Sequence, residues 1–310
     1  MAAGQPRRKA HTAKAGRAFF VFKRRGMRML VPCEKREWKL LEPYAWDMLG
    51  NLEAVSFPLY HDGVKTETSF LHRVEEAFTR PDEELLLYYH SGRAEGWAHT
   101  YWIPEESALG LVSMAVQGDF GQALEELLVY WKKRFPGYQW FSYFPADNRG
   151  AHSFLQRSGY TPQPPENVAV LLFDNYSART EASRVVKIGQ ETFPLFCQIH
   201  SRFEGSMYWT SERMKSQLDK WSIFAYMEKG KCLGALYYNH QTQKDLEIFG
   251  LDLLEKEREI AGELLFSALN QAKAGGARSM YFFHEPVWTP MLESLGFKNL
   301  TTALGYSGAV

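Results

Sequence analysis

An internal repeat constrains the fold of this chain more than any other feature of its sequence. Residues 148–160 read Asn-Arg-Gly-Ala-His-Ser-Phe-Leu-Gln-Arg-Ser-Gly-Tyr, and a weaker version of this pattern recurs 137 positions later, from Glu285 through Leu292 to Gly296 and Phe297. Other positions repeat at an offset of 138: Tyr88, Gly92, Arg93, Gly96 and Ala98 correspond to Tyr226, Gly230, Lys231, Gly234 and Leu236. Similar offsets in separate segments predict two copies of one structural unit.

Length and composition agree with two such units. The 310 residues are 45% hydrophobic and 23% charged, which is ordinary for globular protein of about two domains. The most apolar runs, 85–89 and 168–173, have the length of a strand and fall far short of the roughly 20 residues of a membrane-spanning helix. Three cysteines, Cys33, Cys197 and Cys232, show neither disulfide nor metal-ligand spacing. We therefore expect a cytoplasmic protein without a membrane segment or a metal site.

The charge is unevenly distributed along the chain. Residues 1–33 contain nine Lys or Arg and no acid, so the remainder has 27 bases against 36 acids. A basic arm of this kind can contact nucleic acid or anionic lipid. The simpler interpretation, which we favour, is a disordered extension over residues 1–26 that precedes the folded chain.

The hydrophobic pattern predicts a mixture of helices and strands in the first unit, residues 27–174. Amphipathic spacing predicts helices, and short apolar runs between turn residues predict strands. The expected helices cover 34–59, with a break near Gly50, then 67–79, the stretch after Gly121, and 148–158. The expected strands cover 84–89, 96–103, 108–116, 139–144 and 168–173.

The second unit, residues 183–310, follows the same order after a polar linker at 175–182. We expect its helices near 191–203, 211–220, 258–274 and a short one ending at Ser294. Its expected strands cover 223–227, 232–239, 246–254, 279–284 and 302–306. The chain is therefore predicted to be an α+β protein with two domains, each a mixed, mostly antiparallel sheet flanked by helices.

A strand meander followed by a long helix, a strand, a short helix and a last strand resembles the GNAT superfamily of N-acyltransferases. The resemblance covers nearly all of residues 30–310. The last short helix of that family carries Asn-x-x-Ala-x-x-x-Tyr-x-x-x-Gly-Phe, to which Asn148, Ala151, Gly159 and Tyr160 correspond. Leu155 stands where the family has tyrosine, and the family uses that tyrosine as the general acid for the departing thiolate. The resemblance implies a tandem GNAT protein with acetyl-CoA as co-substrate.

The family binds the pyrophosphate of coenzyme A where its central strand leads into the long helix, because free N–H groups and the helix dipole attract anions there. In the first unit the resemblance implies that the coenzyme contacts eight residues: Met114, Val116, Gly118, Phe120, Gly121, Gln122, Ala123 and Asn148. In the second unit Lys256 stands at the family's basic position, but Glu259 replaces its first glycine. A carboxylate repels a diphosphate, so we expect the first unit to hold the coenzyme.

Acyl transfer to an amine needs a base for the ammonium proton and a polarised thioester carbonyl. In the first unit Tyr101 and Glu106 are the candidate catalytic residues, because both lie near the predicted strand ends that border the cleft. In the second unit Glu247, Asp252 and His284 lie in comparable places. Each of these residues has a structural alternative as a strand-end charge, a sheet aromatic or a hydrogen-bonded histidine.

Three functions follow from these patterns. The first is an acetyl-CoA-dependent N-acetyltransferase acting on a small-molecule amine or amino-acid-like acceptor, without membrane or nucleic-acid partners. The second is a non-catalytic protein that binds coenzyme A or a metabolite, which the missing tyrosine favours. The third is a Fem-like aminoacyl transferase using charged tRNA, for which the basic arm is the only support. The sequence does not indicate the acceptor, the acyl length or the oligomeric state.

Overall fold

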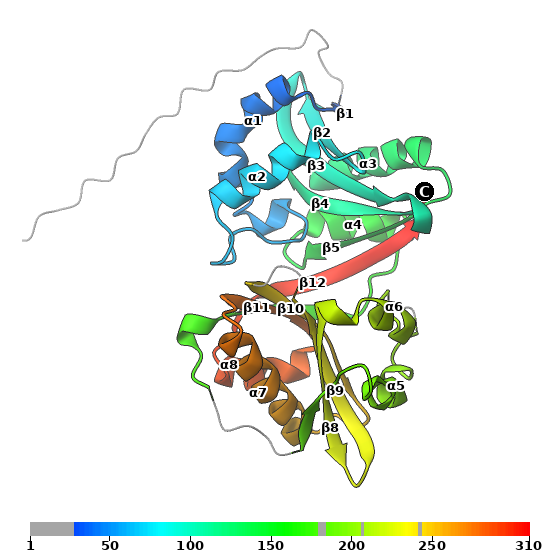
Figure 1. Ribbon diagram of the computed structural model, residues 1–310. Coiled ribbons are helices and arrows are strands. Elements are labelled where there is room, and N and C mark those ends of the chain that lie inside the picture. The colour runs from blue at the N-terminus through cyan, green and yellow to red at the C-terminus, as the bar shows by residue number, and fades with distance from the viewer. Residues whose placement is uncertain (1–27, 179–183, 206–207, 241–243) are drawn as a thin grey trace, which may run out of the picture.

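A single mixed sheet of twelve strands runs through the whole molecule (Figure 1). The computed structural model describes residues 28–178, 184–205, 208–240 and 244–310. The strand order is β1-β2-β3-β4-β5-β12-β6-β11-β10-β9-β8-β7. All neighbours are antiparallel except β4 with β5 and β10 with β11, which are parallel. The predicted basic arm, residues 1–26, and half of the predicted linker, residues 179–182, lie outside the described residues.

The first half of the chain, residues 28–178, follows the predicted order of elements. Its helices are α1 (Lys35–Met48), η1 (Leu52–Ala54), α2 (Glu67–Ala77), η2 (Pro104–Glu106), α3 (Phe120–Arg134), α4 (Arg149–Arg157) and η3 (Phe173–Asn175). Its strands are β1 (Arg28–Pro32), β2 (Glu83–His90), β3 (Arg93–Ile103), β4 (Ala108–Val116), β5 (Gln139–Pro145) and β6 (Glu166–Leu172).

The second half, residues 184–310, repeats this order from its first long hairpin onward. Its helices are α5 (Phe193–His200), α6 (Ser211–Ser216), η4 (Leu218–Lys220), α7 (Arg258–Ala274), η5 (Pro286–Trp288) and α8 (Thr289–Ser294). Its strands are β7 (Val185–Lys187), β8 (Trp221–Glu228), β9 (Lys231–Asn239), β10 (Asp245–Leu253), β11 (Ser279–His284) and β12 (Lys298–Ala309).

The two halves exchange their closing strands. β6 belongs to the first half but pairs with β11 of the second, and β12 belongs to the second half but pairs with β5 of the first. β6 and β12 also pair with each other, from Lys298 opposite Val170 to Ala303 opposite Glu166. β6 precedes the predicted linker in the sequence, yet in the sheet it lies next to β11 of the second half. The domain limits drawn from the sequence therefore stay a prediction.

Helices cover both faces of the sheet and enclose four apolar clusters. In the first half α1 and α2 cover one face, with Trp38, Phe70 and Trp97 at the centre, and α3 and α4 cover the other, with Trp131 and Phe144. In the second half α7 and α8 pack over Leu246, Ile248 and Phe282, while α5 and α6 pack over Trp221 and Tyr237. The four neighbouring strands β5, β12, β6 and β11 lie at the centre of the sheet. This central region, which β12 crosses in Figure 1, is here called the waist.

Three differences from the predicted elements have physical causes. β1 and β7 are missing from the prediction because they are short edge strands, and most of the stability of such strands comes from the partner strand. The helix expected to extend to residue 59 ends at Met48, and residues 55–57 are instead extended and bonded to the sheet. β12 is longer than expected because it pairs along its length with β5 and β6.

We predict that Tyr306→Ala weakens both halves together. The Tyr306 side chain is fully buried on β12, packs near Phe144 and contacts His152, so its loss should lower the free energy of unfolding by roughly 3–5 kcal/mol. Hydrogen exchange should speed up in β5 and also in β6 and β11. Ser307→Ala, on an exposed side chain of the same strand, is the control. Faster exchange confined to one half would show that the two halves unfold independently.

Candidate functional site

The structure contains two places where parallel central strands diverge, one in each half. In the first half β4 and β5 pair only from Ala108 opposite Gln139 to Gly110 opposite Phe141. Beyond that point the remaining residues of β4 pair with β3, and those of β5 pair with β12. Diverging strands leave backbone N–H and C=O groups that need other partners, so each opening is a potential binding edge.

The opening of the first half is filled by the chain itself. The Ser56 N–H donates to the Met114 carbonyl at 2.9 Å, and the Met114 N–H donates to Ser56 Oγ at 2.8 Å. On the other side the Phe57 N–H donates to the Tyr143 carbonyl at 3.0 Å, and Val55 forms a bridge with Ala115. Residues 55–57, here called the filling segment, therefore occupy the edge that a ligand would use. Both backbone groups of Met114 are thus bonded to Ser56, and a contact of Met114 with the coenzyme stays a prediction.

The predicted asparagine is part of this filling. Asn148 is 0% exposed, its Nδ2 donates to the Val55 carbonyl at 2.9 Å, and its Oδ1 accepts from the Ala151 N–H at 3.0 Å. Both polar ends of the side chain are thus used inside the protein. Asn148 is therefore the N-cap of α4, and the same side chain secures the filling segment.

The glycine turn before α3 is also closed. A Cβ at Gly121 would lie 2.8 Å from the Gly150 carbonyl, so α3 and α4 are in direct contact where the resemblance implied room for a pyrophosphate. The Gln122 N–H is satisfied by the Asp119 side chain, and Phe120 and Ala123 are buried in the core. A cavity of about 420 Å³ remains beside Val116 and Gly118, but Asp47 and Glu53 line it without any Lys or Arg. These charges disfavour a diphosphate.

The two predicted catalytic residues of the first half lie at a contact between the halves. Tyr208 Oη donates to Glu106 Oε1 at 2.9 Å, and Arg213 lies 3.5 Å from the same carboxylate. Tyr101 lies over Gly110, where a Cβ would be 2.9 Å from its hydroxyl. The Tyr208 hydroxyl therefore bridges the two halves. Tyr101 and Glu106 stay a prediction as catalytic groups.

The opening of the second half differs because no segment fills it. β10 and β11 pair from Asp245 opposite Ser279 to Ile248 opposite Phe282, and a bulge at Phe249 then separates them. Among the described residues, no backbone hydrogen bond joins 249–253 to any segment except β9. Residues 249–251 are partly exposed, whereas the corresponding end of β4 is buried. This edge is therefore the open one.

A groove lies between α7 and α8, the helices that pack on one face of the second half of the sheet. Its volume is about 490 Å³, and its lining residues are Arg258, Glu259, Gly262, Glu263, Phe266, Pro290, Met291 and Ser294. A Cβ at Gly262 would find its nearest neighbour 3.8 Å away. Glu259 corresponds to Gly121 of the first half, where a Cβ would lie only 2.8 Å from the Gly150 carbonyl of α4. The helices of the second half thus leave space that α3 and α4 do not.

The entry to α7 has mixed charges. Lys256 forms an exposed ion pair with Glu285, and Arg258 begins the helix and lines the groove. Glu255, Glu257 and Glu259 surround these two cations, so the five residues carry a net charge of −1. The helix start can offer N–H groups and one groove-facing guanidinium to an anion, with the carboxylates acting against it.

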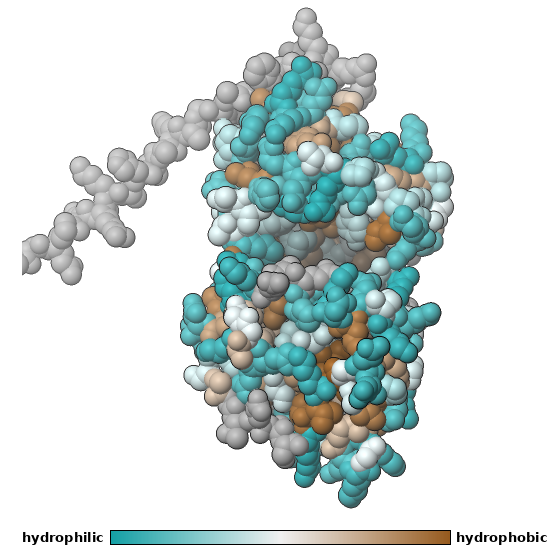
Figure 2. Space-filling view, viewed as in Figure 1, coloured by the Kyte–Doolittle hydropathy of each residue, from teal (hydrophilic) through white to brown (hydrophobic). Residues whose placement is uncertain are grey.

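Acidic and aromatic side chains gather on the face of the sheet at the waist. Glu247 lies on β10 just before the bulge, and Glu166 on β6 accepts a hydrogen bond of 2.9 Å from Tyr143 Oη. The centroid of the Tyr143 ring lies 5.6 Å from that of Phe283 and 4.9 Å from that of Phe141. The Phe141 side chain is 40% exposed. Figure 2 shows the surface drawn in at this waist between the two halves.

Burial raises the pKa of two carboxyl groups at the waist. Burial raises the pKa of Glu247 to about 7, and the neighbouring Glu166 raises it further, while Lys65 acts in the opposite direction. Burial also raises the pKa of Glu166, despite the hydrogen bond from Tyr143. A carboxyl group that titrates near neutral pH is suited to accepting a proton from an amine.

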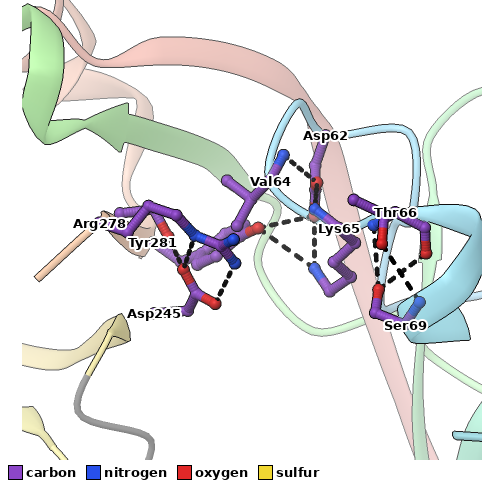
Figure 3. A network of polar contacts seen from close by, with 9 residues as sticks. Asp62, Val64, Lys65, Thr66, Ser69, Asp245, Arg278 and Tyr281 are labelled. Atoms are coloured by element: carbon purple, nitrogen blue, oxygen red, sulfur yellow. Dashed lines mark hydrogen bonds and ion pairs between the residues drawn. The ribbon is translucent and has the colours of Figure 1, made fainter. Parts of the chain in front are cut away.

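A polar network fixes the loop before α2 to the second half (Figure 3). Tyr281 Oη donates to Asp62 Oδ2 at 2.7 Å, and the Val64 and Lys65 N–H groups donate to Asp62 Oδ1 at 2.8 Å. Lys65 forms an ion pair with Asp62 and lies 4.5 Å from the centre of the Tyr281 ring. Although burial opposes it, Lys65 holds the pKa of Asp62 below its usual range. The network therefore joins residues 62–65 of the first half to β11 of the second half.

The other candidate groups of the second half are buried. Asp252 accepts a hydrogen bond of 2.7 Å from His200 Nδ1, and His200 Nε2 contacts the Trp209 carbonyl at 2.9 Å. His284 is buried, and its Nδ1 must donate to the Glu285 carbonyl at 2.8 Å because a carbonyl only accepts. Asp252 and His200 therefore serve the structure of β10, whereas His284 keeps an unpaired Nε2 within the described part of the chain.

No known family's sequence profile matches the chain, and no curated protein matches it in sequence. Solved structures do match. A GCN5-related N-acetyltransferase from Sphaerobacter thermophilus is 13% identical, with a TM-score of 0.60 over 91% of this chain and 95% of that one. A Drosophila protein is 13% identical, with a TM-score of 0.52 over 91% and 98%.

A third match is the GCN5-related glucosamine N-acetyltransferase region of a fungal multi-domain β-N-acetylglucosaminidase. It is 12% identical, with a TM-score of 0.55, and the alignment covers 92% of this chain and 38% of that one. Identities this low establish the fold. The chain has the fold of the GNAT N-acetyltransferases, as its motifs indicated.

Two further observations limit the chemistry. Within the described residues no group of three or more His, Cys, Asp or Glu is placed to hold a metal ion. In the same part of the chain, none of the helices combines the length and the apolar character that crossing a bilayer requires.

We predict that Asn148→Ala destabilises the protein without weakening binding of acetyl-CoA. The substitution removes the N-cap of α4 and leaves the buried Val55 carbonyl without its partner, which should cost roughly 2–3 kcal/mol in urea unfolding. Arg149→Ala, one exposed position further, is the control. Loss of acetyl-CoA binding with unchanged stability would instead place the coenzyme in the first half.

We predict that Glu247→Gln stabilises the protein in a pH-dependent way. Because the folded pKa of Glu247 is raised to about 7 from 4.5, the native state favours the protonated carboxyl, and this contribution to stability is lost as the pH rises through that interval. The variant, which cannot ionise, should melt at a higher temperature than the wild type at pH 8 and at a similar temperature near pH 4.5. Glu105→Gln, at an exposed position, should show no such trend. An equal difference in melting temperature between variant and wild type at both pH values would contradict the raised pKa of Glu247.

Proposed function

We propose that the chain is an acyl-CoA-dependent N-acyltransferase that transfers acetyl from acetyl-CoA to the amine of a small molecule, with the donor held by the second half. The observation that carries the proposal is the open strand edge between β10 and β11. The chain continues from β10 into α7, whose first turn lines the groove between α7 and α8. This revises the sequence-based preference for the first half, whose corresponding edge is bonded to the filling segment.

The residues of the second half fit an extended donor with an anionic end. The free edge at 249–253 can pair with the amides of a pantetheine chain, as an added strand would. Arg258 at the start of α7 can contact a phosphate, and Gly262 leaves room for the ligand between the helices. The donor supplies the activated thioester, and the chain supplies its position and orientation.

The amine is proposed to approach from the waist. Glu247 lies on the same strand as the open edge, just before the bulge, so its carboxylate can take the proton of an ammonium group that arrives there. The exposed Phe141 ring, the Tyr143 ring and Glu166 offer an aromatic and acidic surface that attracts a cation. An acceptor that carries an amine therefore fits this surface better than an anionic one does.

A non-catalytic coenzyme-binding protein is the alternative that one observation favours. The short helices that close the two halves carry Leu155 and Leu292 where the family motif has tyrosine, and both side chains are buried. The Fem-like alternative rests on the basic arm, residues 1–26, which lie outside the described residues.

The decisive experiment measures acetyl-CoA binding by thermal shift and calorimetry, and free thiol release over a panel of amines. Binding with amine-dependent thiol release supports the acyltransferase, and binding without release over the panel supports the binding protein. No binding at millimolar acetyl-CoA would overturn both. Transfer RNA that binds with steep salt dependence, lost on deletion of residues 1–26, would support the Fem-like alternative.

We predict opposite effects for two neighbouring charges at the start of α7. Arg258→Ala should raise the Kd for acetyl-CoA about fivefold, and Glu259→Gln should lower it by a similar factor, because each changes one charge beside the phosphates by about 1 kcal/mol. Calorimetry measures both constants, with Arg202→Ala as the control at an exposed position away from the groove. If neither variant shifts the Kd, the groove does not hold the phosphates.

A further inference from the structure

One buried hydroxyl lies at the start of the open edge. Tyr237 on β9 is 0% exposed and is the register partner of Gly250 on β10. Its ring lies directly over Gly250, so that a Cβ at this position would overlap the phenol oxygen. Gly250 is the first paired residue after the bulge at Phe249, which is where β10 separates from β11.

The Tyr237 hydroxyl has no hydrogen-bond partner among the described residues. The polar groups around it are already engaged, because His200 bonds both Asp252 and the Trp209 carbonyl. The remaining neighbours are the rings of Phe196 and Trp221, at 5.5 and 6.1 Å between centroids. An unpaired buried hydroxyl costs about 1–3 kcal/mol, so phenylalanine would suit this position better if packing alone mattered.

We propose that the Tyr237 hydroxyl donates a hydrogen bond to the thioester during acyl transfer, an inference that rests on the proposed function and names a further catalytic residue for it. In this step the amine nitrogen bonds to the acyl carbon and the carbon–sulfur bond breaks. Negative charge develops on the carbonyl oxygen and the sulfur, and Tyr237 stabilises it while keeping its own proton. The ammonium nitrogen loses two protons. Glu247 takes the first, and the second is released to solvent, from which the departing thiolate takes up a proton and becomes the free thiol.

Two features of the site support this role. Burial raises the pKa of Tyr237 above its usual range, and the nearby Asp252 acts in the same direction, so the group stays a neutral donor at any working pH. The family's usual tyrosine is also replaced by leucine in both halves, at Leu155 and Leu292. The Tyr237 hydroxyl on β9 would supply the hydrogen-bond donor that Leu292 on α8 does not provide.

The test compares Tyr237→Phe with the wild type in the thiol-release assay. The substitution removes only the oxygen, so kcat should fall about 100-fold, the KM for acetyl-CoA should change less than about twofold, and the melting temperature should not decrease. Tyr238→Phe is the matched control, because Tyr238 is buried on the opposite face of the same strand and stacks near Phe224. Unchanged kcat in Tyr237→Phe overturns the inference, and so does a kcat loss that comes with a lower melting temperature.

A second measurement separates this inference from the proposed function. The carbonyl of acetyl-CoA labelled with carbon-13 should shift downfield when it binds the wild type, and the shift should be absent with Tyr237→Phe. If the wild type binds acetyl-CoA but releases no thiol with any amine, the acyltransferase proposal fails, and the carbonyl shift alone decides whether Tyr237 contacts the thioester. Identical shifts in both proteins overturn the contact, and a wild type that binds no acetyl-CoA overturns both proposals.

Discussion

The pairing of β6 with β12 is the interaction on which the rest of the structure depends. Each strand ends one half of the repeat, and each completes the part of the sheet that belongs to the other half. Without this exchange β5 and β11 would be sheet edges with unpaired backbone groups. The exchange joins two repeats into one sheet, and it places Glu166 of the first half beside the strands that carry the open edge of the second.

Duplication left two strand openings, and the two halves satisfy their backbone groups differently. In the first half Ser56 and Phe57 supply internal partners to both diverging strands. Asn148, at the N-terminus of α4, holds the same segment by its hydrogen bond to the Val55 carbonyl. A filled opening is stable but has no edge to offer. In the second half the corresponding stretch of β10, residues 250–253, pairs with β9 and with no other strand that the structure describes. A binding edge requires that the protein leave such groups to water or to a ligand, so the second half retains the feature on which the proposed function depends.

The repeat and the order of elements could be predicted from the sequence, because periodicity and turn residues report local structure. The short helix predicted at 148–158 is confirmed as α4, with Asn148 as its N-cap. The strand exchange could not be predicted, since either half of the sheet could accept β6 or β12 with the same hydrophobic pattern. The filling segment was assigned to a helix because its apolar residues continue the spacing of α1, and only the long-range bonds to Met114 and Tyr143 make it extended. The sequence-based preference for the first half did not take these bonds into account.

The acidic start of α7 explains why charge alone is a poor guide to the site. Glu259 argued against the second half when only the sequence was considered, yet the structure places it on a groove that also contains Arg258 and Gly262. A surface carboxylate changes a binding free energy by about 1 kcal/mol, whereas a strand edge already bonded to its own chain cannot pair with a ligand at all. The availability of backbone groups therefore outweighs the sign of a side chain, and it favours β10 over β4 as the donor strand.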